Sequence, residues 1–515
     1  MLCVRRFAGF VLLAGLTACG GDAGRAIGLG AQAQQQLDAG QVYEARQTIT
    51  AAVKERDDLP ALHLLRGRIE LSGNRFGPAF DAFAAALSLD ATNQEALQGV
   101  AQLGLRTGHI RESEDAADRI LALQPDQPDA LLVKGQLAMV RNRPAETSEL
   151  ADRILTAAPG NEGGAILKAR ALYMLGDLPG ARDFLNKFET PTKNTEGLAR
   201  TRLELMRQAS DAPGMLAEFS VLGGLLPKDF DLRLDEANLR YKTGDVAGAR
   251  SLLRAVLLDL RPDAAQTARV TALWHEYDRD PLGGAELRIL AQSRNEAARI
   301  EVARYYFETG RFSVARAVIS GARSLEARSL SARVAIASGE TTKGAAAAER
   351  ILANDKTQCD ALLARSAAAA SARRWSAAVN AAQTAAAECP QSVEASIALA
   401  RAYEGQRDPG GVRRAFAEGI VRSPQDPKLG RAFGAWLEAN GQSRQAIAEA
   451  RRLTRKAPAR LSVWAAYLGV CQRQNDESCS LEAREGLSRA RNSFGIDLPS
   501  GTLTPRGLFG RLPPR

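Results

Sequence analysis

Residues 101–135, AQLGLRTGHIRESEDAADRILALQPDQPDALLVKG, contain the pattern that decides the fold. The small residue Ala101 recurs as Gly135, 34 positions later. Between them lie Gly108, seven positions after the first small residue, and Pro125. Glycine suits the left-handed conformation that ends a helix, and proline stops one helix and admits the next. The stretch therefore predicts two helices joined by a tight turn.

The same markers recur along most of the chain. Small residues hold the first position at Ala33, Gly67, Ala101, Gly135, Ala169 and Ala237, and in a second run at Ala332, Ser366, Ala400 and Gly434. Turn residues follow seven positions later, at Gly40, Asn74, Gly108, Asn142, Gly176, Gly244, Gly339 and Gly441. Prolines mark the end of the unit at Pro125, Pro159, Pro227, Pro390, Pro424 and Pro458. Self-similarity at such a period predicts a solenoid of stacked helix pairs.

This pattern resembles the tetratricopeptide repeat. In that family, small residues let the two helices approach closely and a large apolar residue fills the remaining gap. The motif positions are occupied by Ala33, Gly40, Ala45, Ile49 and Ala52 in repeat one, and by Gly67, Phe83 and Ala86 in repeat two. The resemblance implies an all-α fold, a right-handed superhelix of about 14 helix–turn–helix repeats between residues 30 and 493.

Three repeats match the motif weakly. They lie around Ser210-Asp211, between Trp274 and Arg288, and near Asn475-Asp476. The last of these is the terminal repeat, which commonly departs from its family pattern. The interval from Ala303 to Ala332 is shorter than the period, so the register slips there. We therefore divide the array into a first part, 30–325, and a second part, 326–493.

The composition agrees with helices packed closely through small residues. Of 515 residues, 45% are apolar, 25% are charged and only 5% are aromatic. This excludes a disordered chain, a collagen and a large β-sandwich. The net charge of +9 is mild for this length, and 57 of the 68 basic residues are arginines. We interpret them as solvated helix faces with Arg/Glu pairs, and we expect no nucleic-acid partner.

Residues 1–19, MLCVRRFAGFVLLAGLTAC, have the pattern of an export signal. Arg5 and Arg6 precede an apolar stretch over residues 7–16 that is too short to span a bilayer. The segment ends in Leu16-Thr17-Ala18-Cys19, which resembles the bacterial lipobox. The resemblance implies cleavage after residue 18 and lipidation of Cys19; the alternative is an ordinary secretory signal with a chance cysteine.

The two ends of the mature chain are expected to be irregular. Two or more acyl chains on Cys19 would anchor the protein stably. Gly20 in the next position favours the outer membrane over the inner one, by the sorting rule of such lipoproteins. Residues 19–29 are rich in Gly and Ala and predict a flexible tether, and residues 494–515 predict a disordered basic tail.

Four further cysteines predict two disulfides. Cys359 precedes the first helix of one repeat and Cys389 ends its second helix, and these ends are neighbours in an antiparallel pair. Cys471 and Cys479 flank a turn in the terminal repeat. An exported protein favours both bonds. The alternative is four buried thiols. A zinc site is not expected, because no histidine lies near any of the four cysteines.

The sequence predicts a binding protein and not an enzyme. Its three histidines, His63, His109 and His275, lie far apart, and no metalloprotease, nucleophile-elbow or phosphate-loop motif is present. We expect no catalytic residue, metal or cofactor. The resemblance implies a concave groove lined by first helices, but the sequence does not identify its contact residues.

Two functions follow from these features. The first is a non-catalytic scaffold on the periplasmic side of the outer membrane, which binds envelope proteins or extended peptide segments of an assembly such as exopolysaccharide export or pilus assembly. The alternative is a chaperone-like periplasmic protein whose arginines bind anionic polysaccharide or unfolded clients.

Overall fold

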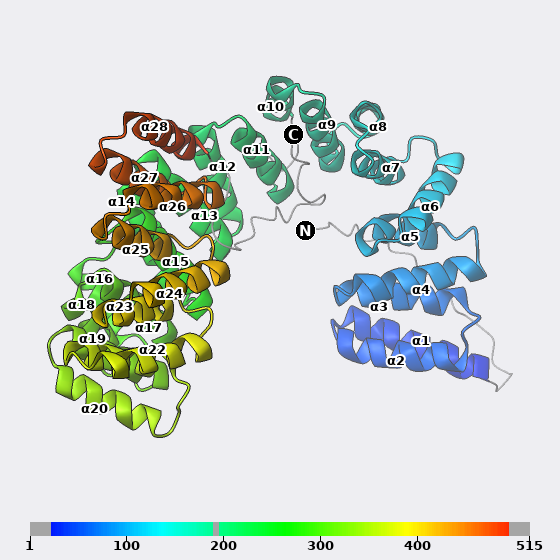
Figure 1. Cartoon of the computed structure of the whole chain (residues 1–515). Helices are drawn as coiled ribbons and strands as arrows, with labels where there is room; N and C mark the ends of the chain where they lie inside the picture. The colour runs from blue at the N-terminus through cyan, green and yellow to red at the C-terminus, as the bar shows by residue number, and fades with distance from the viewer. Residues whose placement is uncertain (1–21, 189–194, 494–515) are drawn as a thin grey trace. The chain divides into compact units, whose positions relative to one another are not determined.

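A computed structural model describes residues 22–188 and 195–493 (Figure 1). These residues form 28 α-helices and no strand, arranged as successive helix–turn–helix pairs. The all-α solenoid of about 14 repeats is therefore confirmed. The weak repeats form complete helix pairs as well.

The described chain divides into two compact units, here called unit 1, which ends at Thr201, and unit 2, which begins at Arg202. Unit 1 contains α1 (Asp22–Asp38), α2 (Val42–Glu55), α3 (Pro60–Ser72), α4 (Phe76–Leu89), α5 (Gln94–Thr107), α6 (Ile110–Leu123), α7 (Pro128–Val140), α8 (Pro144–Ala157), α9 (Glu162–Met174) and α10 (Leu178–Lys187). The boundary falls within α11 (Glu196–Gln208).

Unit 2 continues with the remaining helices. The helices up to the register slip are α12 (Ala212–Leu225), α13 (Phe230–Thr243), α14 (Val246–Asp259), α15 (Ala264–Tyr277), α16 (Gly284–Gln292), α17 (Glu296–Glu308) and α18 (Phe312–Ile319). Those after it are α19 (Leu325–Ala337), α20 (Thr341–Leu352), α21 (Cys359–Ser371), α22 (Trp375–Glu388), α23 (Val393–Gly405), α24 (Pro409–Arg422), α25 (Pro427–Ala439), α26 (Ser443–Lys456), α27 (Leu461–Arg473) and α28 (Glu477–Asn492).

The odd-numbered helices form an inner layer in each unit. From α1 to α9, and again from α13 to α27, each first helix contacts the first helix of the next repeat. The second helices pack behind them, mainly on their own partner and on the first helix that follows. The free face of the inner layer is therefore the surface that successive repeats present together.

The turns form where the sequence predicts them. All eight predicted turn residues have positive φ, between 55° and 91°. Arg373 and Arg407 occupy the same turn position of their repeats, and they too have positive φ, at 56° and 60°. An arginine in this conformation is less favourable than a glycine, so the packing of the two helices imposes it.

Close helix packing depends on the small residues. The Phe83 ring of α4 lies against both Gly67 of α3 and Gly99 of α5. A Cβ atom on Gly67 would come within 2.7 Å of that ring, and one on Gly99 would come closer still. One large side chain thus fills the space that two glycines leave open.

Two boundaries differ from those predicted. Helix α1 begins at Asp22, inside the expected tether, because Ala26 packs in the core with Ala45 and Ile49. The division expected at residues 325 and 326 interrupts no core, since one apolar cluster extends from Phe230 to Val334. The register slips because α18 has only 8 residues, against 14 in α14.

The Phe83 contact can be tested with two glycines. We expect Gly99→Ala to lower the free energy of unfolding by roughly 1–3 kcal/mol, because the new methyl group overpacks the ring. Gly77→Ala, in α4, should be neutral or slightly stabilising, because nothing lies within 4 Å of the point where its methyl group would stand. Urea unfolding followed by circular dichroism measures both, and equal effects would contradict this packing.

Candidate functional site

The inner face of unit 1 exposes a mixed surface. Gln98 and Gln102 of α5 are exposed, and so is Val140 of α7, with 73% of its surface accessible. Arg68 of α3 donates a bidentate hydrogen bond to Glu95 of α5, and both side chains keep more than a third of their surface exposed. Amide side chains can pair with a peptide backbone, and exposed apolar side chains can pack on partner residues.

The inner face of unit 2 differs, because its own later repeats cover it. Asp360, Glu394, Lys428 and Ser462 succeed one another at the 34-position period of the repeats. Each is the second residue of its first helix, in α21, α23, α25 and α27 respectively. We call these four residues the ladder. They meet side chains of α15, α17 and α19.

Glu308 of α17 is the centre of one such meeting. His275 Nε2 of α15 lies 2.9 Å from Glu308 Oε2, and Lys428 of α25 forms an ion pair with the same carboxylate. Lys428 Nζ also lies 3.5 Å from Glu394 Oε1 of α23. Only 12% of the Glu308 side chain is exposed. Four helices therefore converge on one carboxylate.

Glu276 of α15 forms the second meeting. Its carboxylate accepts a hydrogen bond of 2.7 Å from the backbone N–H of Ser462 and another from the Ser462 hydroxyl. Arg460 Nε lies 3.8 Å away. Only 7% of the Glu276 side chain is exposed, so the start of α27 covers it.

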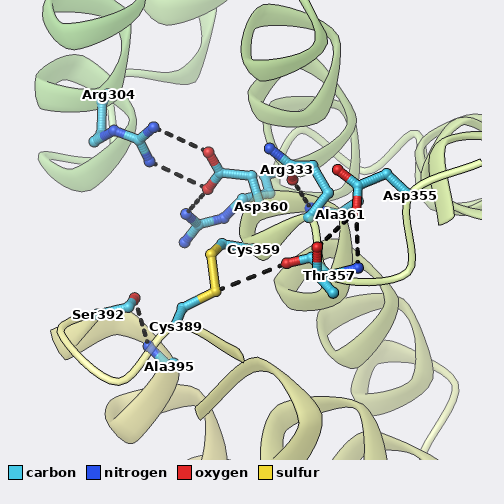
Figure 2. Close-up of a disulfide and its surroundings, with 11 residues drawn as sticks. Arg304, Arg333, Asp355, Thr357, Cys359, Asp360, Ala361, Cys389, Ser392 and Ala395 are labelled. Atoms are coloured by element: carbon cyan, nitrogen blue, oxygen red, sulfur yellow. Dashed lines mark hydrogen bonds and ion pairs between the residues drawn. A yellow bond between two sulfur atoms is a disulfide. The ribbon is translucent and has the colours of Figure 1, made fainter. Parts of the chain in front are cut away.

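Asp360 joins three successive first helices (Figure 2). Arg304 of α17 donates two hydrogen bonds to its carboxylate, at 3.1 and 2.9 Å, and Arg333 of α19 donates a third, at 2.5 Å. The neighbouring residue, Cys359, is bonded to Cys389 across the α21–α22 pair. The disulfide thus restrains the first turn of α21, from which Asp360 reaches the arginines.

The charges set the pKa values of the buried acids. Burial alone would raise the pKa of Asp360, but Arg304 and Arg333 reverse this effect and hold it below its usual value. Burial would also raise the pKa of Glu308, but His275 and Lys428 hold it far below its ordinary range.

Glu394 shifts in the opposite direction. Its pKa is raised, first by burial and then by the adjacent Glu308 carboxylate, to which the protonated Glu394 carboxyl donates a hydrogen bond. Ionising both of two adjacent buried carboxylates costs free energy, because the two negative charges repel each other. One proton is therefore held at Glu394 while Glu308 stays charged.

The cysteines expected to pair are paired in the structure, Cys359 with Cys389 and Cys471 with Cys479, at Cα–Cα distances of 6.1 and 5.5 Å. Cys19 lies outside the described residues, as do the signal segment and the tail. Among the described residues, no three His, Cys, Asp or Glu side chains form a metal-binding group. No helix in that part of the chain is long and apolar enough to cross a membrane.

The ladder and its partners were not predicted from the sequence. Of these residues only His275 was singled out, as an isolated histidine. The regular spacing of four polar residues at the start of first helices was a usable signal. Their partners Arg304, Glu308 and Glu276 could not be read from it, because these residues lie two or more repeats away.

The comparisons with known proteins agree with this architecture. Residues 101–162 match the family model of the tetratricopeptide repeat. This part of the chain carries tetratricopeptide repeats. Proteins of this kind are interaction scaffolds, and arrays of such repeats bind partners along extended surfaces. No curated protein matches the chain.

Several solved structures resemble parts of the tetratricopeptide array. A thermophilic tetratricopeptide protein of Thermus thermophilus is 18% identical, with a TM-score of 0.32, and the match covers 35% of this chain and 98% of that one. PilF of Pseudomonas aeruginosa is 15% identical, with a TM-score of 0.32 and coverage of 40% and 94%. PilW, a type IV pilus biogenesis factor, is 19% identical, with a TM-score of 0.34 and coverage of 39% and 94%.

The raised pKa of Glu394 predicts a pH dependence. A group whose pKa is raised in the folded state stabilises it while protonated, and this contribution is lost as pH rises through the folded-state pKa. Glu394→Gln stays neutral, so we expect it to stabilise unit 2 at about pH 8, by roughly 1–3 kcal/mol. Near pH 4.5 the gain should vanish.

Urea unfolding at the two pH values measures this effect. Glu404→Gln is the matched control, because Glu404 is an exposed residue of the same helix, α23, and its substitution should change little. A destabilised Glu394→Gln variant, or a gain that is equal at both pH values, would contradict the assignment of the proton.

The disulfides can be tested by peptide mapping and by substitution. In protein recovered from an oxidising compartment, non-reducing peptide mapping should link Cys359 to Cys389 and Cys471 to Cys479. Replacing Cys359 and Cys389 together by Ser should cost roughly 2–4 kcal/mol, because the bond closes a loop of about 30 residues. Four free thiols in such protein would refute both pairs.

Proposed function

We propose that the protein is a non-catalytic scaffold of the bacterial envelope, held at the periplasmic face of the outer membrane by lipidated Cys19. The lipobox-like segment that ends at Cys19 supports the anchor, and Gly20 supports the choice of membrane. Its partners are proteins of an envelope assembly, of the kind found in exopolysaccharide export or pilus assembly.

The observation that carries the scaffold function is the exposed inner face of unit 1. Its first helices present amides, an exposed ion pair and exposed apolar side chains along one continuous layer. An extended partner segment can hydrogen-bond to Gln98 and Gln102 and pack on Val140. We therefore place the partner on unit 1.

Photo-crosslinking in cells tests this placement. A photoreactive amino acid at position 102, on the exposed face of α5, should capture the partner in a defined product. The same amino acid at position 149, exposed on the second helix α8, should not. Equal capture at both positions, or none at 102, would contradict a partner site on this face.

Membrane anchoring has its own test. We expect Cys19→Ala to move the protein from the membrane fraction to the soluble periplasmic fraction, because the acyl chains attach there. Cys3→Ala is the control: it changes a cysteine within the signal segment and should leave the protein in membranes. Retention of the Cys19→Ala variant after a carbonate wash would reject lipidation.

The charge distribution favours one alternative, binding of an anionic polysaccharide. Residues 202–493 contain 43 basic and 34 acidic residues, whereas residues 22–201 contain 20 basic and 24 acidic ones. A polyanion would therefore bind unit 2, and its affinity would fall steeply with added salt. Capture of a protein segment that survives high salt would favour the scaffold.

A further inference from the structure

Solenoid repeats normally contact only their neighbours. Unit 2 departs from this rule at several places, and three of them span more than 100 residues. Ser462 binds Glu276 across a sequence separation of 186 residues, and Lys428 binds Glu308 across 120. Lys242 donates a hydrogen bond to the carbonyl of Ser493, 251 residues later. Helices α15 and α27 also contact each other directly.

These contacts bring the last repeats of unit 2 against α13, α15 and α17. The ladder residues Lys428 and Ser462 therefore reach back to inner-layer helices that precede them by four to six repeats. Polar groups form these three long-range contacts within unit 2.

Glu276 and Glu308 of unit 2 are more buried than Glu95, which lies on the exposed face of unit 1. Glu276 and Glu308 expose 7% and 12% of their side chains, whereas Glu95 of unit 1 exposes 37%. All three belong to first helices. In unit 2, Lys428 and Ser462 therefore cover first-helix carboxylates of the kind that unit 1 leaves exposed.

We propose that the contacts of Lys428 with Glu308 and of Ser462 with Glu276 form a clasp that keeps the inner face of unit 2 closed. The clasp acts as a closing contact: later repeats of the array cover the first helices α15 and α17. When it breaks, α25 and α27 move away from α15 and α17, and the acidic side chains of the inner face become exposed.

Substitutions of the clasp residues distinguish a closure from incidental surface pairs. Lys428→Met removes the cation and leaves Glu308 beside Glu394. Lys428→Arg keeps the charge and should behave like the natural chain. Lys343→Met is the matched control. It breaks an ion pair with Glu340, the residue just before α20, and the Lys343 side chain is 75% exposed.

The separation between α16 and α26 reports the closure. Spin labels can be carried by a ketone-bearing amino acid at positions 289 and 444, which are exposed and leave the disulfides intact. Double electron–electron resonance on the full chain should give one narrow distance distribution for the natural sequence, Lys428→Arg and Lys343→Met. In Lys428→Met it should lengthen and broaden.

A second measurement does not depend on Lys428. Glu276→Ala removes the acceptor of the Ser462 N–H, so hydrogen exchange in the first turn of α27 should accelerate by about tenfold or more. Glu485→Ala, at an exposed residue of α28, should leave it unchanged. If Lys428→Met fails to fold by circular dichroism, the exchange measurement decides.

The proposal is overturned if the distance distribution of folded Lys428→Met matches that of the natural chain. It is also overturned if Glu276→Ala leaves exchange in α27 unchanged. Neither readout uses a partner protein, so failure of the clasp would leave the scaffold function untouched, and failure to find a partner on unit 1 would leave the clasp untouched.

Discussion

The close approach of neighbouring helices is the constraint on which the rest of the structure depends. Phe83 fits only because Gly67 and Gly99 lack side chains, and buried alanines hold the Gly67 position in other repeats, at Ala33, Ala101 and Ala169. The buried apolar residues therefore form successive clusters along each unit, in which alanines outnumber aromatic residues. Because each helix pair must fit its neighbours, the direction of every first helix is set by local packing, and the inner layer follows from it.

Local packing was readable from the sequence, and this explains which predictions were confirmed. The turn residues were found because only glycine and asparagine adopt positive φ readily, and all eight have it. Arg373 and Arg407 were missed because their side chains give no sign of that conformation. The repeat around Trp274 matches the motif weakly, and Trp274 packs there in one cluster with Tyr305 and Tyr306 of the next repeat.

The candidate site could not be predicted in the same way. Glu276 and Glu308 meet partners that are 186 and 120 residues distant, and those pairings depend on the accumulated rotation of several repeats. A small change in the rotation per repeat would add up over the four repeats between α17 and α25 and would move Lys428 away from Glu308. The two inner faces therefore differ in accessibility although the same repeat pattern builds both, and buried charge at Asp360, Glu308 and Glu276 marks the one that is covered.

The ladder has a consequence for how this chain can change in length. In the described part of unit 1, the helices pack on neighbouring repeats, so a duplication or loss of one whole repeat would leave the packing of the others intact. In unit 2, one repeat added between α17 and α25 would shift Lys428 by one position around the superhelix and separate it from Glu308. Evolution can therefore lengthen or shorten the first unit freely, whereas the number of repeats in the second is fixed by its own ion pairs.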